Sequence, residues 1–166
     1  MNQELGIMEN KELAQWISDI SKKELGLLYY FPEEIEEAIK ENRYILLKEG
    51  DRRVGFGLWT IRANWLELHT LYIAPEFRGR GYMSKLLEVG YERLKDSPFK
   101  IYAFTRAGAV MHGIEKYGFR PGSFFDLPWR VIFGIFWHRL NPRRWPSYLK
   151  YGWKIFGAWK WELYIR

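Results

Sequence analysis

The sequence predicts a mixed α/β fold in which helices flank a central sheet. Helix and strand patterns alternate along the first 119 residues, and one strand runs through a glycine-rich loop into an apolar helix. The chain has 166 residues, of which 48% are hydrophobic, enough for one core and short for two. We therefore expect one domain over residues 1–166.

Two helices are expected at the start of the chain. Residues 11–23 place Leu13, Trp16, Ile17 and Ile20 at the spacing of an amphipathic helix. A second helix begins at Pro32, because proline is favoured in a first turn and two glutamates follow it, and it runs to about residue 42.

Three strands follow, at residues 44–48, 53–61 and 65–73. The turns between them are short, so the strands are expected to form an antiparallel meander. A helix over residues 82–95, a strand over residues 100–105 and a helix over residues 107–117 come next, and Gly118 ends the last helix.

The loop between the third strand and the third helix carries alternating arginine and glycine, Arg78-Gly79-Arg80-Gly81. The glycines let the backbone approach a ligand, and the helix that follows presents unpaired N–H groups to an anion. Neither a Walker loop nor a dinucleotide fingerprint fits, because the required Lys-Ser/Thr pair and third Gly are missing. The loop is typical of a pyrophosphate clamp.

This segment resembles the acetyl-CoA loop of the GNAT N-acetyltransferases, whose pattern Arg/Gln-x-x-Gly-x-Gly/Ala is preceded by a strand and a Pro. The resemblance covers residues 33–119 and includes a second family-like segment, residues 114–119. It implies the GNAT fold, acetyl-CoA as co-substrate and acetyl transfer to a primary amine. The residues it implies for acetyl-CoA binding are Leu71, Tyr72, Ile73, Arg78, Gly79, Arg80, Gly81, Tyr82, Met83 and Ser84.

The resemblance also implies catalytic positions in the third strand. The backbone N–H of Leu71 corresponds to the usual oxyanion donor, and Glu67 falls where histone-acetylating members carry their catalytic glutamate. Strand alternation places Glu67, His69 and Leu71 on one face. Histidine ordinarily titrates near neutrality, so either Glu67 or His69 is a candidate base; a solvated Glu67 and a packed His69 remain the alternatives.

Three positions depart from the family pattern. Ile114 stands where many members have a Tyr acid, Ala107 replaces a usual Asn, and Met83 takes the last small-residue position of the loop. Isoleucine cannot donate a proton to the departing thiolate. His112, Tyr117, Tyr82 or solvent are the substitutes, although His112 is better explained as an exposed helix residue.

The composition narrows the remaining classes. The chain has no Cys, which rules out disulfides, thiolate catalysis and Cys-based metal sites and suits a reducing cytoplasm. We find neither a signal-peptide pattern nor an apolar run long enough to span a bilayer. A cytoplasmic protein without a metal is expected.

The C-terminal part is basic and aromatic. Residues 120–166 carry nine Lys or Arg against two Asp or Glu, and hold six of the nine Trp. About thirty residues, approximately 124–158, are inserted before a last strand at residues 159–165. Three explanations of this insertion compete. It could be a structural lid or a homodimer contact, or a lid that shapes an apolar acceptor pocket or accepts a longer acyl chain. It could also be a surface for membrane headgroups or RNA.

We expect the aromatic side chains of this insertion, Trp129, Phe133, Phe136 and Trp137, to face protein, and Arg143 and Arg144 to remain outside. The function expected overall is acetylation of an unidentified amine, on a small molecule or a protein. Two alternatives stay open. One is toxin-like acetylation of aminoacyl-tRNA, and the other is a catalytically inactive acyl-CoA-binding or interaction module.

Overall fold

The computed structural model describes residues 2–24, 27–105, 107–145 and 162–166. The contacts divide the chain into two compact units, which we describe separately. Unit 1 comprises residues 1–43 and 140–158, and unit 2 comprises residues 44–139 and 159–166. The expectation of one domain therefore stays a prediction.

Unit 1 is built on two packed helices, α1 (Asn2–Lys23) and α2 (Pro32–Lys40). Helix α1 begins at Asn2 rather than at residue 11, and it buries the apolar residues Leu13, Ala14 and Ile17. Two buried serines join α1 to the segment before α2. The Ser18 hydroxyl donates to the Tyr30 carbonyl at 2.8 Å, and the Ser21 hydroxyl accepts from the Tyr30 N–H at 3.1 Å.

Arg144 returns to this helix pair from far along the chain. It ends the short helix η3 (Pro142–Arg144) and is fully buried, whereas Arg143 is exposed. The Arg144 guanidinium donates to the Tyr29 carbonyl and to Glu34 Oε1, the latter at 2.5 Å. The prediction that both arginines lie outside was therefore correct for Arg143 and wrong for Arg144, whose charge is paired inside unit 1.

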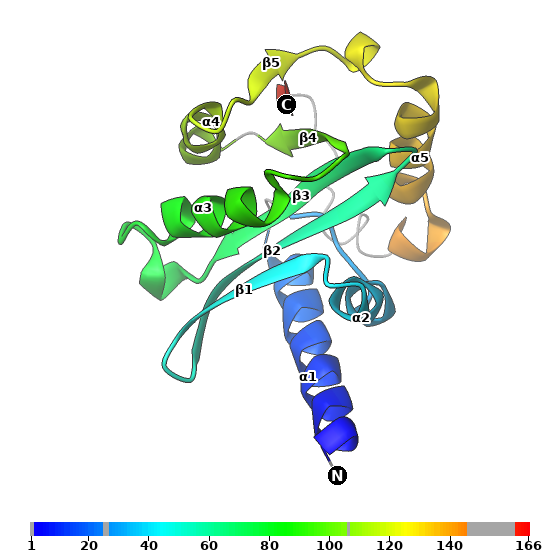
Figure 1. Ribbon diagram of the computed structural model, residues 1–166. Helices are drawn as coiled ribbons and strands as arrows, with labels where there is room; N and C mark the ends of the chain where they lie inside the picture. Colours follow the sequence, from blue (N-terminus) through cyan, green and yellow to red (C-terminus); the bar gives the residue numbers. More distant parts are fainter. Residues whose placement is uncertain (1, 25–26, 106, 146–161) are drawn as a thin grey trace. The chain divides into compact units, whose positions relative to one another are not determined.

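Unit 2 contains a six-stranded mixed sheet in the order β1-β2-β3-β4-β6-β5 (Figure 1). Only β3 and β4 run parallel; the other neighbours are antiparallel. The strands are β1 (Tyr44–Glu49), β2 (Arg52–Arg62), β3 (Trp65–Ile73), β4 (Lys100–Thr105), β5 (Arg120–Gly122) and β6 (Glu162–Ile165). The last strand was expected from residue 159, and residues 159–161 lie outside the described ranges.

Helices cover both faces of this sheet. Helix α3 (Tyr82–Leu94) packs against β1, β2 and β3 and contacts α4 (Gly108–Glu115). Helix α5 (Trp129–Arg139) packs its Val131 and Ile135 into a cluster with Tyr102 and Leu163. Because Tyr102 and its neighbour Ile101 point to opposite faces of β4, α5 lies on the face opposite α3 and α4.

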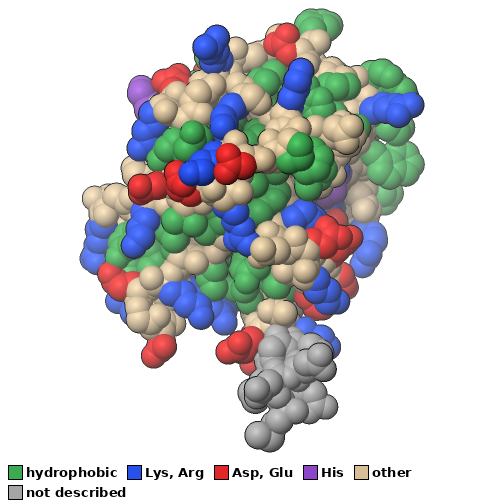
Figure 2. Space-filling model, viewed as in Figure 1, with side chains coloured by type: hydrophobic (Ala, Val, Ile, Leu, Met, Phe, Trp, Pro, Cys, Tyr) green, Lys and Arg blue, Asp and Glu red, His purple; other side chains and the backbone are tan. Residues whose placement is uncertain are grey.

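The aromatic side chains of α5 point outward. Trp129, Phe133, Phe136 and Trp137 are all exposed, so the prediction that they face protein was wrong. The core takes the smaller aliphatic residues of the helix instead, together with Leu127 just before it. Hydrophobic side chains are visible along the edge of the space-filling view that corresponds to α5 (Figure 2).

A β-bulge interrupts β3 at His69. Leu58 of β2 lies opposite Thr70, and the next residue, Trp59, lies opposite Leu68, so His69 is the extra residue on β3. The two-residue alternation of side chains therefore changes phase within the strand. The expectation that Glu67, His69 and Leu71 lie on one face of the strand assumed that this alternation is uninterrupted.

Across the described ranges, no helix combines the length and the apolar character needed to cross a membrane.

Candidate functional site

The parallel strands β3 and β4 separate partway along their length. Their pairing runs from Trp65 opposite Lys100 to Leu68 opposite Ala103 and ends there among the described residues. Beyond that point β4 pairs only with β6, through Phe104 and Thr105, and the two ribbons diverge in Figure 1. The C-terminal half of β3 thus has one open backbone edge.

Leu71 and Ile73 present their backbone groups to this open edge. The Ala74 N–H donates to the Val54 carbonyl at 2.8 Å, and hydrogen bonding to an antiparallel neighbour alternates along a strand. Tyr72 therefore bonds β2, while the N–H and C=O groups of Leu71 and Ile73 point the other way. The Ile73 carbonyl confirms this direction, since it accepts a hydrogen bond from Arg78 Nε at 2.9 Å.

The glycine loop lies directly after this edge. Gly79 and Gly81 adopt φ values of +75° and +80°, which L side chains rarely adopt, and Gly81 is the N-cap of α3. A Cβ added at either glycine would have no other atom within 4 Å. The first intrahelical bond runs from the Lys85 N–H to the Gly81 carbonyl. The N–H groups of the first turn of α3, before Lys85, therefore point out of the helix at the loop.

Arginines surround the same loop. The Arg52 guanidinium lies 4.6 Å from the centroid of the Phe77 ring, and the Arg80 guanidinium lies 6.0 Å from it. Arg78 lies over Tyr72 at 5.7 Å while it bonds Ile73. Arg52 comes from the β1–β2 hairpin, so sequence spacing did not place it near the loop. Backbone N–H groups and positive side chains together suit a phosphate-bearing ligand.

Glu49 of the same hairpin holds Tyr82. The Tyr82 hydroxyl donates to Glu49 Oε1, and this hydrogen bond is the main cause that raises the pKa of Tyr82 above its ordinary value. Desolvation and the negative charge of Glu49 raise it further, whereas Arg80 and Arg52 lower it. This hydrogen bond joins Tyr82, the first residue of α3, to the β1–β2 hairpin.

Glu67 lies buried on the α5 face of the sheet. Its Oε2 accepts a hydrogen bond from the Tyr102 hydroxyl at 3.1 Å and pairs with Arg62 Nε at 3.4 Å. Neither partner was singled out in the sequence. Glu67 lies opposite Tyr102 in the parallel pairing of β3 with β4. Aligning the two strands correctly would therefore have identified Tyr102 as a partner of Glu67. A solvated strand residue is thus ruled out for Glu67.

His69 is half-buried and bonded to two threonines. Its Nε2 lies 3.1 Å from the Thr60 hydroxyl, and its Nδ1 lies 2.8 Å from the Thr70 hydroxyl. Thr60 lies directly opposite Glu67 on β2, so Glu67 and His69 lie on the same side of the sheet. The structure brings these two candidate bases together.

The Leu71 side chain lies on the opposite face from Glu67, against the expectation of a shared face. Leu68 and Leu71 line one apolar pocket on the α3 side, because the bulge at His69 shifts the alternation between them. The role assigned to Leu71 depends on its backbone N–H, which lies in the plane of the sheet. Both faces can therefore approach that group at the open edge.

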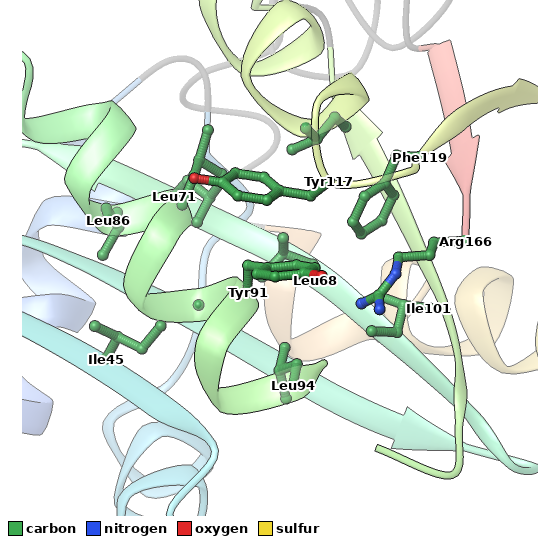
Figure 3. A pocket seen from close by; sticks show the side chains of 13 residues that line it. Ile45, Leu68, Leu71, Leu86, Tyr91, Leu94, Ile101, Tyr117, Phe119 and Arg166 are labelled. Carbon is green, nitrogen blue, oxygen red and sulfur yellow. The ribbon is translucent and has the colours of Figure 1, made fainter. Parts of the chain in front are cut away.

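This apolar pocket lies between the sheet, α3 and α4 (Figure 3). Tyr91 of α3 and Tyr117 stack at 4.6 Å between ring centroids, and Ile114 also lines it. Leu71 contributes its side chain here and its backbone to the open edge. The pocket therefore adjoins the divergence of β3 and β4.

The structure places each of the residues considered as an acid. Ile114 is buried in the apolar pocket. His112 is exposed on α4, and its Nδ1 lies 2.8 Å from the Gly108 carbonyl, as the interpretation of an exposed helix residue anticipated. Tyr117 stacks on Tyr91, and Tyr82 bonds Glu49. None of these contacts directs a proton donor at Leu71.

Comparison with protein families gives one assignment. The model of the acetyltransferase (GNAT) family matches residues 10–119, about two thirds of the chain. No curated protein sequence matches this chain.

Solved structures with the same fold include several acetyltransferases. A Mycobacterium tuberculosis protein in complex with CoA has a TM-score of 0.66 at 13% identity, over 93% of both chains. The N-acetylglutamate synthase of Neisseria gonorrhoeae, complexed with CoA and N-acetylglutamate, has a TM-score of 0.61 at 16% identity. That match covers 93% of this chain and 32% of the synthase. A ribosomal-protein-alanine N-acetyltransferase from Brucella melitensis has a TM-score of 0.55 at 19% identity, over 70% and 82% of the chains.

Proposed function

Because the chain belongs to the acetyltransferase (GNAT) family, we propose that it transfers the acetyl group of acetyl-CoA to a primary amine. The observation that carries this proposal is the open edge of β3, where the Leu71 N–H points away from β2 beside a glycine loop with exposed backbone. The loop suits the pyrophosphate of CoA, and the open edge suits the amide-bearing arm that leads to the thioester.

Acetyl-CoA supplies a thioester carbonyl whose carbon accepts the amine nitrogen. The new C–N bond forms as the C–S bond breaks, and the carbonyl oxygen carries negative charge during the exchange. The Leu71 N–H donates to that oxygen. The edge holds this donor rigidly, because β2 fixes β3 on its other side.

Glu67 and His69 serve as the base. The amine must lose a proton to become nucleophilic and a second after the C–N bond forms, while the departing sulfur takes one up. Both residues already have hydrogen-bond partners, Thr60 and Thr70 for His69 and Tyr102 and Arg62 for Glu67, but His69 is half-buried whereas Glu67 is buried. His69 is therefore the group that exchanges protons with the amine, and Glu67 adds negative charge on the same face.

Solvent returns the proton to the thiolate. A thiol has an ordinary pKa of about 8.5, so the leaving group needs little assistance near neutral pH. This route agrees with the apolar Ile114 at the family's Tyr position.

The same Ile114 favours one alternative, an acyl-CoA-binding module without catalysis. One experiment distinguishes acetyl transfer from binding without catalysis. Peptides, polyamines and charged tRNA are each offered as acceptors, the free thiol released from acetyl-CoA is measured, and products are identified by mass. An acetylated amine supports transfer and names the acceptor class. Tight CoA binding with no product from any amine supports the module, and absence of CoA binding contradicts both.

A further inference from the structure

Helix α5 has two faces of opposite character. Val131 and Ile135 are buried in the core of unit 2. Opposite them the helix exposes four large aromatic side chains: Trp129 at 70%, Phe133 at 60%, Phe136 at 53% and Trp137 at 74%. At 3.6 residues per turn, these four positions fall within an arc of roughly 100°. We call this surface the α5 aromatic face.

The α5 aromatic face is an unusual surface to leave in water. Single exposed apolar residues are common on proteins, but contiguous patches of large ones mark interaction sites. The rings of Phe133 and Trp137 stack with 6.1 Å between their centroids, so these two side chains form one apolar surface. A partner that covers it must be apolar where it meets the rings.

The charge of Arg130 and the composition of the surrounding sequence indicate the kind of partner. Arg130 is exposed beside it, with its guanidinium 5.6 Å from the centroid of the Trp129 ring. Residues 127–161 contain seven Lys or Arg, eleven aromatic residues and no Asp or Glu. The chain has a net charge of +6, so this segment with +7 leaves −1 for the remainder. Along the sequence, the positive charge is therefore concentrated in the same segment as these aromatic residues.

We propose that the α5 aromatic face binds the surface of an anionic lipid bilayer. Aromatic rings enter the boundary between headgroups and acyl chains, and a cation beside them, here Arg130, pairs with the anionic headgroups. Single-stranded RNA binds in positively charged grooves, where successive bases stack on aromatic side chains. The aromatic residues of α5 instead lie on the outer face of a helix, and Phe133 and Trp137 stack on each other, which favours a lipid surface. This binding is independent of the acetyl transfer proposed above.

Vesicle co-sedimentation of the full chain tests this proposal. The probes are vesicles of phosphatidylcholine alone and vesicles of phosphatidylcholine with an equal amount of phosphatidylglycerol. We expect binding to the anionic vesicles, weakened by added salt, and little binding to the neutral ones. The double variant Phe133→Ser/Trp137→Ser should lower the vesicle-bound to free ratio by roughly tenfold or more.

Val89→Ser is the matched control, because it removes an exposed apolar side chain from α3 instead of α5. It should bind vesicles like the unmodified chain. Far-ultraviolet circular dichroism and a cooperative thermal transition show whether each variant is folded, and Phe133→Ser alone serves if the double variant is not. Since these side chains are exposed, we expect both variants to fold.

Four results would overturn the proposal. The first is that the protein does not bind anionic vesicles at low salt. The second is that a folded α5 variant binds vesicles as well as the unmodified chain does. The third is salt-sensitive binding to RNA by a protein that does not bind vesicles. The fourth is that the unmodified chain does not bind vesicles and sediments as a dimer, whereas the α5 variant sediments as a monomer. That result would assign the face to a second copy of the chain.

Discussion

Leu68 and Leu71 point into the same pocket although three positions separate them along a β-strand. The bulge at His69 produces this relationship, and the pairing of β3 with β4 ends at the residue just before the bulge, Leu68. The one extra residue thus has two effects. It turns Leu71 away from the face that holds Glu67, and it marks the point beyond which the Leu71 N–H lies on an open edge.

Gly81→Asp should weaken CoA binding by roughly tenfold or more, measured by calorimetric titration. The new carboxylate would lie where the structure has open space, at the N-cap of α3, and would repel the phosphates of the ligand. Gly118→Asp is the matched control, because Gly118 has a similar φ of +85° and also has open space around its Cβ position. Equal affinity in both variants would place the site elsewhere.

His69→Ala should remove the low-pH limb of the kcat/KM profile, whereas Glu67→Gln should keep that limb and lower the rate. A base acts only when unprotonated, so activity rises with pH through its pKa, and replacing it removes that rise. Glu67→Gln also weakens the bonds to Arg62 and Tyr102, so its unfolding must be measured alongside. If the limb disappears in Glu67→Gln and persists in His69→Ala, the roles are reversed.

Arg144→Ala should lower the free energy of unfolding by about 1 to 3 kcal/mol in urea denaturation. The change removes a buried guanidinium that bonds the Tyr29 carbonyl and Glu34, and it leaves a cavity beside the Phe31 ring. Arg143→Ala is the neighbouring control. Its side chain is exposed over the same ring at 4.6 Å, so it should change stability by less than about 0.5 kcal/mol.

Tyr82 should ionise at a higher pH than an ordinary tyrosine. The phenolate absorbance of the unmodified protein minus that of Tyr82→Phe isolates its titration among the eleven tyrosines. Because its folded pKa is raised, the Glu49 bond stabilises the fold below pH about 10 and is lost as pH rises through the folded value. Glu49→Gln should lower the midpoint, and an unchanged midpoint would mean that the carboxylate is not the cause.

The sequence predicted the order of elements in the first 119 residues because each has a local signal. The 3.6-residue spacing, Pro32 at a helix start and Gly118 at a helix end all act within a few residues. The bulge at His69 has no such signal. Residues 65–73 are compatible with uninterrupted alternation, and the shift becomes visible only when β3 is aligned with β2.

Burial in the inserted segment could not be predicted for a different reason. Helix α5 carries aliphatic residues on one face and aromatic residues on the opposite face, so its pattern does not say which of the two packs inward. The sheet selects Val131 and Ile135. The burial of Arg144 depends on Glu34, which is 110 residues away in the sequence. Both outcomes are set by tertiary contacts.

The position of β6 governs when the sheet can be completed during synthesis. Residues 162–165 lie between β4 and β5, so β4 leaves the ribosome with one unpaired edge and β5 leaves it without a partner strand. The nascent chain carries these edges, and the aromatic segment before β6, until β6 emerges. Such edges pair readily with other chains. Because the inner strand β6 follows both of its neighbours in the sequence, the risk of pairing with other chains persists until β6 is in place.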